Sequence, residues 1–331
     1  MQELQITMLG PSGVGKTTLL TAMYEQFESN IGQTNLELTP DEDSAAILQD
    51  RLIDLKSLLD VFEARGRTGI KGTEALAGPD SLRSFNFGLG RKGEPPSLQL
   101  HFRDYPGQYH TTRASRDEKQ FVEELLRESV AVLIAVDAPA LMEDSTGGLH
   151  EKVNRPQQLK NLFQRAYNNL DTPKLVIFAP VKCEKYMQNE ESAKELVEKV
   201  RKGYDNLLNY FNAEKLSPWV VSVITPVQTV GSVVFSRLER DENHEPHFYF
   251  RKIRSDAQYE PIDSEQPLRY LLRFLLKLHL ESRSQKWGFF SFVRDWLGLD
   301  DHLKKSVEEF AKGCKNRNGF VVLKGEKWLN I

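Results

Sequence analysis

The stretch GPSGVGKTT, residues 10–18, directly follows the short apolar run ITML at residues 6–9. It fits the pattern G-x-x-x-x-G-K-[ST], in which successive backbone N–H groups curl around the phosphates of a nucleotide. Glycine leaves room for the phosphates and tolerates the positive φ angles that such a curl requires. The helical stretch that follows would point its positive N-terminal end at the anion. The sequence therefore predicts a phosphate-binding loop and an α/β fold of the P-loop NTPase type.

The residues of this loop have distinct predicted roles. Lys16 would reach the β- and γ-phosphates and stabilise charge in the transition state, and Thr17 would place its hydroxyl on Mg²⁺. The expected nucleotide contacts come from Gly10, Ser12, Gly13, Val14, Gly15, Lys16, Thr17 and Thr18. The alternative interpretation is a glycine-rich turn between a strand and a helix that binds no ligand.

The overall composition is that of a globular chain, and no targeting signal is evident in the sequence. The 331 residues are 40% apolar and 27% charged, and the net charge of -3 gives no general attraction to nucleic acid or acidic lipid. Two cysteines, Cys183 and Cys314, are too few for a disulfide framework, which favours a reducing compartment. The N-terminus lacks the features of a signal peptide, and no apolar stretch is long enough to cross a membrane. We therefore expect a cytoplasmic location.

Three further apolar runs predict buried strands of a parallel sheet. They cover residues 130–139, 174–186 and 219–231, and amphipathic stretches at 157–170 and 191–211 separate them as predicted helices. Continuous apolar runs are typical of strands that are buried on both faces. The alternation of strands and helices favours a doubly wound, mostly parallel sheet, which binds ligands at the carboxyl ends of its strands.

Two insertions interrupt a predicted nucleotide-binding domain at residues 1–280. The first, a helical insertion at about residues 35–80, contains a helix whose N-terminal cap we assign to Thr39. The second is a hairpin insertion at about residues 232–261. Residues 281–331 are predicted to form a small appendage with a helix and a terminal hairpin. Its aromatic segment KWGFFSFVRDWLGL would either dock on the main domain or contact a partner or a membrane.

A second motif, RDYPGQYH at residues 103–110, follows a predicted strand pair within residues 84–102. Asp104, at the carboxyl end of the second strand, is placed to hold Mg²⁺ through water. Gly107 could offer its N–H to a γ-phosphate, and Gln108 could orient an attacking water molecule. The alternative is a turn that merely closes a hairpin.

The order of these motifs resembles the translation-factor-related (TRAFAC) class of GTPases. That class combines a phosphate loop, a D-x-x-G-Q element as at residues 104–108, and a K-x-[DE] element as at Lys182 and Glu184. The sequences APVKCEKY and YEPIDSEQPLRYLL, with the helical insertion, resemble the TRAFAC-like group sometimes called double-GTPases. Those are bacterial proteins often associated with conflict or defence gene clusters. The resemblance covers roughly residues 3–280.

The resemblance implies a base-recognition element N-K-x-D at residues 181–184, from which this chain departs. Lys182 matches the lysine that stacks over the base, but Val181 replaces the asparagine and Glu184 replaces the aspartate. A carboxylate still selects guanine, whose ring N–H and amino group are donors, over adenine, whose ring nitrogen is an acceptor. Glu184 therefore favours GTP, and the alternative is a solvated Lys/Glu pair after a buried strand.

A threonine before the strand pair is also expected to complete the Mg²⁺ shell. Thr73 is our choice and Thr68 the second, although a threonine that bonds its own turn is equally ordinary. No arginine is assigned to the transition state. Arg65, Arg67 and Arg113 are candidates, and a partner protein is the other source.

Together these features predict a GTPase that hydrolyses GTP to GDP and phosphate with Mg²⁺, slowly without a partner. It would act as a switch in a bacterial multi-protein system, with defence as the role that the resemblance suggests. Its partners would be GTP, GDP and proteins that contact the switch loops or the appendage, with no nucleic acid. Two alternatives stay open, an ATPase of the same fold and a nucleotide-gated interaction module with little turnover.

The sequence HEPH, with His244 and His247, is the remaining candidate for a metal site. It lies on an expected turn, and no third ligand is near in the sequence. We therefore expect a surface loop there.

Overall fold

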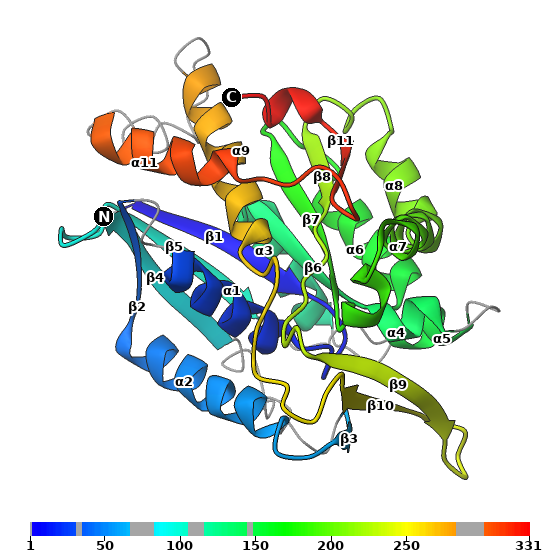
Figure 1. Ribbon diagram of the computed structural model, residues 1–331. Helices are drawn as coiled ribbons and strands as arrows, with labels where there is room; N and C mark the ends of the chain where they lie inside the picture. The colour runs from blue at the N-terminus through cyan, green and yellow to red at the C-terminus, as the bar shows by residue number, and fades with distance from the viewer. Residues whose placement is uncertain (1, 31–34, 67–82, 105–115, 144–147, 283–300) are drawn as a thin grey trace.

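The computed structural model describes residues 2–30, 35–66, 83–104, 116–143, 148–282 and 301–331. Within them, eight strands form the main sheet: β1 (Gln2–Leu9), β2 (Leu36–Pro40), β4 (Arg83–Arg91), β5 (Leu98–Asp104), β6 (Ala131–Asp137), β7 (Lys174–Val181), β8 (Val220–Ile224) and β11 (Val321–Lys324). Their order is β11-β8-β7-β6-β1-β5-β4-β2 (Figure 1). The strands from β8 to β5 in this order pair in parallel, and the pairs at both edges are antiparallel. The predicted α/β fold with a mostly parallel sheet is confirmed.

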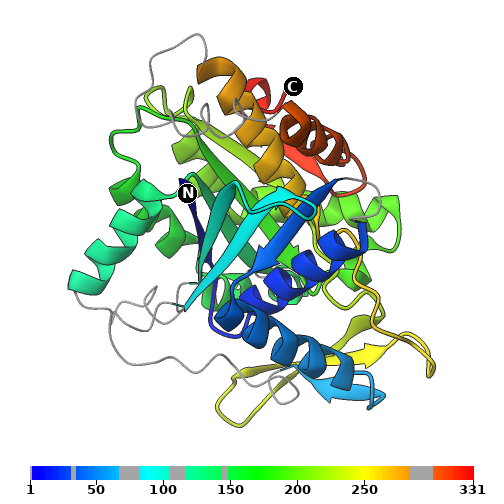
Figure 2. The same ribbon diagram turned by 90° about the vertical axis from the view of Figure 1, so that its left-hand side faces the viewer.

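Helices cover both faces of the main sheet (Figures 1 and 2). Those in the described residues are α1 (Lys16–Asn30), α2 (Glu42–Ser57), α3 (Arg116–Glu128), α4 (Ala138–Met142), α5 (Gly148–Val153), α6 (Pro156–Ala166), α7 (Glu190–Gly203), α8 (Asp205–Phe211), α9 (Gln266–Ser282) and α11 (Asp301–Lys312), with 3₁₀ turns η4 (Glu184–Met187) and η6 (Glu326–Trp328). Apolar side chains of α1, α9 and α11 form the core on one face, and those of α3, α6, α7 and α8 form the core on the other. None of these described helices has both the length and the apolar character needed to cross a membrane.

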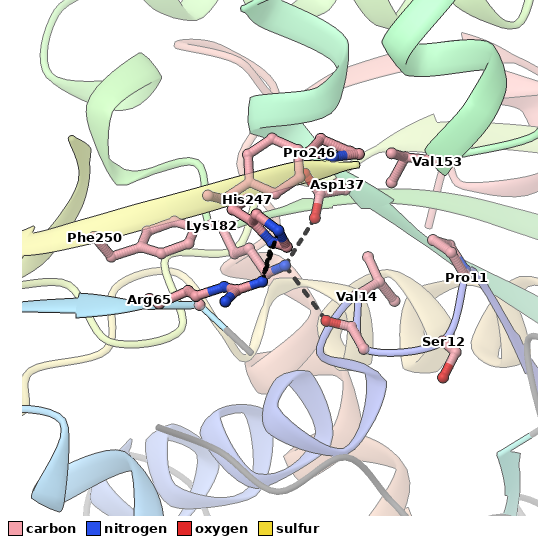
Figure 3. Close-up of a pocket in the computed structure, with 13 residues that line it drawn as sticks. Pro11, Ser12, Val14, Arg65, Asp137, Val153, Lys182, Pro246, His247 and Phe250 are labelled. Carbon is pink, nitrogen blue, oxygen red and sulfur yellow. Dashed lines mark hydrogen bonds and ion pairs between the residues drawn. The ribbon is translucent and has the colours of Figure 1, made fainter. Parts of the chain in front are cut away.

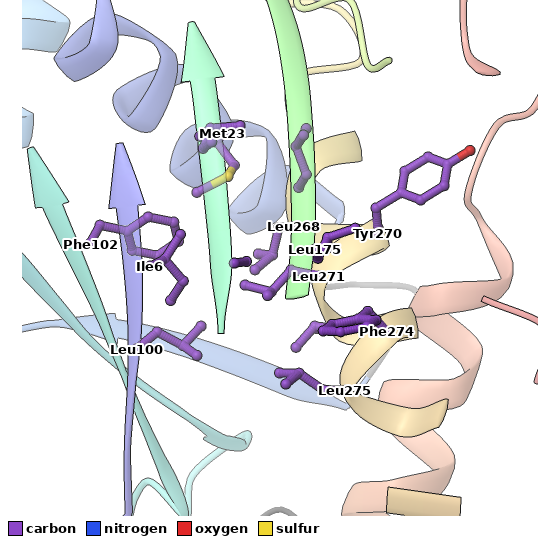
Figure 4. Close-up of a cluster of buried hydrophobic side chains, with 14 of the residues drawn as sticks. Ile6, Met23, Leu100, Phe102, Leu175, Leu268, Tyr270, Leu271, Phe274 and Leu275 are labelled. Carbon is purple, nitrogen blue, oxygen red and sulfur yellow. The ribbon is translucent and has the colours of Figure 1, made fainter. Parts of the chain in front are cut away.

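The burial pattern follows from this layering. Strand β7, which helices cover on both sides, is buried at every position, whereas β5 alternates between buried and half-buried residues. On the face of α1 and α9, Ile6 of β1 and Leu100 of β5 lie against Met23 of α1 and Leu271 of α9 (Figure 4). This core fixes the strand ends from which the loops of the candidate site leave.

A second, three-stranded sheet lies beside the start of α1 (Figure 1). It consists of β3 (Glu63–Arg65), β10 (Pro246–Lys252) and β9 (Val233–Arg240), all antiparallel, and we call it the small sheet. An apolar cluster of Leu55 from α2 with Val230 and Val233, to which Phe250 adds its ring, joins it to the main body. The small sheet therefore unites strands from both insertions, which are far apart in the sequence.

Two local predictions are wrong. The helix of the first insertion begins after Asp41, which accepts a hydrogen bond from Ser44 N at 2.9 Å, because Thr39 is already paired with Gly88 in β2. The terminal hairpin does not form either. Strand β11 pairs with β8 at the edge of the main sheet, and η6 follows it, because the apolar residues of this end are buried against the main body.

Candidate functional site

The loop between β1 and α1 has the backbone that phosphate binding requires. Gly10, Gly13 and Gly15 all have positive φ angles, of 149°, 74° and 108°. Gly10 also lies against β6, since a Cβ atom at this position would be 2.8 Å from the carbonyl oxygen of Ala135. Only glycine combines this backbone angle with such close approach. The loop thus leaves the sheet beside β6 and enters α1 at Lys16.

At the start of α1, three polar side chains meet at the carboxyl end of β5. Lys16 Nζ lies 3.5 Å from Asp104 Oδ1 and 3.4 Å from the carbonyl oxygen of Gly10. The Thr17 hydroxyl donates to Asp104 Oδ2 at 3.3 Å. All three side chains are buried. The predicted phosphate-binding lysine and two of the predicted magnesium ligands, Thr17 and Asp104, are therefore neighbours.

This cluster fits a magnesium ion. Asp104 Oδ1 is buried and accepts no hydrogen bond from the described residues, although Lys16 lies near it. A carboxylate and a hydroxyl beside a phosphate site are the oxygen ligands that Mg²⁺ prefers. No group of three or more His, Cys, Asp or Glu side chains arranged as a metal site occurs in the described part of the chain.

On the other side of the loop, Lys182 connects the end of β7 to the phosphate loop. Its Nζ donates to Asp137 Oδ2 at 2.7 Å and lies 3.4 Å from the carbonyl oxygen of Gly13 (Figure 3). Lys182 has φ 57°, an uncommon value for a residue with a side chain. Such strained backbone persists where the surroundings hold it, and often at functional sites.

Asp137 is the buried anchor of this arrangement, and it is not among the site residues predicted from the sequence. Its Oδ1 caps α4 by accepting from Ala140 N at 3.0 Å, while Asn154 bonds both its backbone N–H and its carbonyl oxygen. The signal was present, because an aspartate that ends a buried strand and precedes Ala-Pro is a typical helix cap.

Glu184 lies at the start of η4 with its carboxylate turned toward residues 225–231. Its Oε1 accepts hydrogen bonds from Val230 N at 3.1 Å and Gly231 N at 3.4 Å. The side chain is buried, and this burial raises the pKa of the Glu184 carboxyl. A base bound here would share the carboxylate with this loop.

A pocket lies between the phosphate loop and the small sheet (Figure 3). One wall is formed by Pro11, Ser12, Gly13, Val14, Asp137, Val153 and Lys182, and the other by Arg65, Gly66, Pro246, His247, Phe248 and Phe250. The expectation of a mere surface loop at HEPH is therefore wrong for His247. This residue lies in β10, which folds back over the loop, and no sequence pattern near it indicates that contact.

Several predicted residues lie outside the described residues. These are Gly107, Gln108, Thr73, Thr68, Arg67, Arg113 and the aromatic segment at 286–299. Of the three candidate arginines, only Arg65 belongs to the described part of the chain.

Two solved structures show what this chain is similar to. They are of the Ski7 GTPase-like domain of S. cerevisiae, one bound to GTP and one bound to GDP and inorganic phosphate. The first is 13% identical over 70% of this chain and 44% of that chain, with a TM-score of 0.40; the second is 14% identical over 68% and 43%, with a TM-score of 0.38. This chain thus spans less than half the length of those chains. No protein-family model and no curated protein sequence matches it.

Proposed function

We propose that this chain binds a purine nucleoside triphosphate with Mg²⁺, that GTP is the preferred nucleotide, and that hydrolysis to GDP and phosphate is slow without a partner. The observation that supports this proposal best is the set of side chains that gather around the phosphate loop. Lys16, Thr17 and Asp104 meet on one side of it, and Lys182 reaches Gly13 on the other. One side suits the phosphates and their metal ion, and the other suits the nucleoside.

The chain's own residues would work mainly by position and charge. Thr17 and Asp104 would hold Mg²⁺, which neutralises developing charge on the phosphate oxygens. The ammonium of Lys16 and the backbone N–H groups of the loop would stabilise the same charge without covalent chemistry. Gln108 is the proposed residue for orienting the attacking water, with Gly107 on the γ-phosphate and Thr73 in the metal shell.

The preference for guanine rests on Glu184, the only part of the proposal that reads the base. A specific observation favours the rival, an ATPase of the same fold. The Glu184 carboxylate already accepts two hydrogen bonds from backbone N–H groups of the 225–231 loop. These bonds form without a base, so Glu184 could serve the loop alone and leave the base unread. Ionised Glu184 offers only acceptors, which match the donors of guanine and repel the acceptor nitrogen of adenine. We therefore retain GTP.

Calorimetric titration of the wild-type protein with GTP and with ATP tests this, each with Mg²⁺ and with EDTA. We expect GTP to bind more tightly than ATP, and EDTA to weaken both. Tighter binding of ATP would reject the guanine assignment, and no binding of either would reject the whole proposal. Phosphate release measured on the same samples separates a hydrolase from an interaction module.

A switch role in a bacterial defence system is proposed from the sequence resemblance alone. Its test is whether a protein that co-purifies with this chain accelerates phosphate release.

Replacing the buried carboxylate of Glu184 should change how stability depends on pH. Because its pKa is raised in the folded protein above the ordinary 4.5, the folded state binds more protons over that interval. The free energy of unfolding of wild type should therefore fall as pH rises from about 4.5 through the raised pKa. The Glu184→Gln variant should lack this fall. Urea unfolding of nucleotide-free protein at a series of pH values measures it.

The matched control is Glu191→Gln, which neutralises an exposed glutamate of α7. Its pH profile should follow that of wild type. Parallel profiles for wild type and Glu184→Gln would contradict the buried, protonatable carboxylate.

Glu184→Gln should also reduce the preference for GTP over ATP, because the amide offers a donor as well as an acceptor. Calorimetric titration of the variant with each nucleotide measures this preference.

A further inference from the structure

The small sheet places a second cationic side chain opposite the phosphate loop. Arg65 ends β3 and lines the pocket whose other wall is residues 11–14 of the loop, as Figure 3 shows. Lys16 faces the opposite direction, toward Asp104. The bound nucleotide proposed above would therefore have cationic side chains on both sides of its phosphate chain, Lys16 on one side and Arg65 with Lys182 on the other.

The guanidinium of Arg65 is held by His247 of β10. Its Nη2 contacts both nitrogens of the imidazole and lies 2.8 Å from Nε2. His247 Nε2 lies 3.0 Å from Asp241 Oδ2 at the turn of the hairpin. If the Nε2 proton is donated to Asp241, Nδ1 is left as the acceptor for Arg65. The chain Asp241–His247–Arg65 thus orients the guanidinium.

The strand that carries Arg65 is also fixed. Residues Glu63 to Arg65 pair with β10, and Gly66 N donates to the carbonyl oxygen of Phe248 at 2.8 Å. Gly66 permits this closeness, since a Cβ atom there would be 2.6 Å from the ring of Phe250. Ser236 of β9 donates to Glu63 Oε1 at 2.7 Å. Arg65 therefore sits on a braced element and not on a loose loop end.

We propose that Arg65 binds the phosphates nearest the nucleoside, from the side opposite Lys16, with His247 as its positioning residue. This rests on the nucleotide binding proposed above. Its location supports that assignment, because the pocket borders the first half of the loop and the Lys182 side, whereas the β- and γ-phosphate lysine lies beyond it. A guanidinium fork is suited to two phosphate oxygens at once. The ligand is thus a nucleoside diphosphate or triphosphate bound between the main and small sheets.

The test compares nucleotide affinities of arginine variants by calorimetry with Mg²⁺, using the base that wild type prefers. Arg65→Gln keeps most of the side-chain length but removes the charge. It should weaken the nucleoside triphosphate and the diphosphate by a similar factor, roughly 10-fold to 100-fold, the range of one charged hydrogen bond. Arg65→Lys keeps the charge but not the fork, so it should bind more tightly than Arg65→Gln. Arg251→Gln, an exposed arginine of the same sheet outside the pocket, should bind like wild type.

Three outcomes would overturn the assignment of Arg65. Arg65→Gln could bind as tightly as Arg251→Gln, its loss could be confined to the triphosphate, or Arg65→Lys could bind no better than Arg65→Gln. Each leaves the proposed function standing as long as wild type binds nucleotide and Lys16→Ala binds it far more weakly. Absence of binding in wild type would instead reject the proposed function itself. Thermal unfolding of the nucleotide-free variants shows whether the small sheet tolerates each change.

Discussion

The Lys16→Ala variant is expected to lose about 100-fold to 1,000-fold of the affinity for the preferred purine triphosphate. The reason is that Lys16 is the cation of the phosphate loop, buried between the Gly10 carbonyl and Asp104 at the start of α1. Two charge-assisted hydrogen bonds to phosphate are together worth about 3–4 kcal/mol, which corresponds to that factor. Calorimetric titration with Mg²⁺ measures the loss.

The variant also leaves Asp104 without its cation, and a buried carboxylate that has lost its partner is destabilising. The double variant Lys16→Ala/Asp104→Asn removes that charge, so it should recover stability without recovering the affinity that Lys16 provides. Lys194→Ala, which removes an exposed lysine of α7 that pairs with Glu190 across one helical turn, should bind like wild type. Unchanged triphosphate affinity in Lys16→Ala would contradict the proposed role of the loop.

The sequence was a good guide to the candidate site wherever its residues are adjacent in the chain. The phosphate loop could be predicted because its glycines, lysine and threonine are adjacent in the chain and each answers to a distinct physical need. Asp104 could be added because the alternation of apolar residues ends there, and the carboxyl end of a parallel strand is where ligands bind. The strands β6, β7 and β8 followed from continuous apolar runs, since both of their faces are covered.

The small sheet could not be predicted in the same way. Its strand β3 has three residues, and it pairs with β10 from a hairpin more than 180 positions later. The local sequence pattern of neither segment predicts that the two will pair. Arg65 and His247 therefore became neighbours only in the fold, and each on its own is an ordinary surface residue type. The wrong prediction of a terminal hairpin has a related cause, because β11 pairs with β8 across about 100 residues of intervening chain.

The Gly10→Ala variant is expected to lower the free energy of unfolding by about 2–4 kcal/mol and to weaken nucleotide binding severely. A methyl group here would meet the Ala135 carbonyl oxygen at 2.8 Å, and backbone in the middle of the sheet cannot move aside cheaply. The positive φ of 149° adds strain for any residue with a side chain. Urea unfolding measures the first effect and calorimetry the second.

Gly93→Ala separates these two causes. Gly93 also has a positive φ, 78°, but a Cβ atom there would meet nothing within 4 Å. Its substitution should therefore cost only the backbone strain, about 1 kcal/mol, and leave nucleotide affinity unchanged. Equal losses of stability in the two variants would show that β6 does not constrain the loop. A larger loss in Gly10→Ala would mean that β6 holds the phosphate loop in its binding conformation before any nucleotide arrives. Binding would then lose little free energy to ordering of the loop.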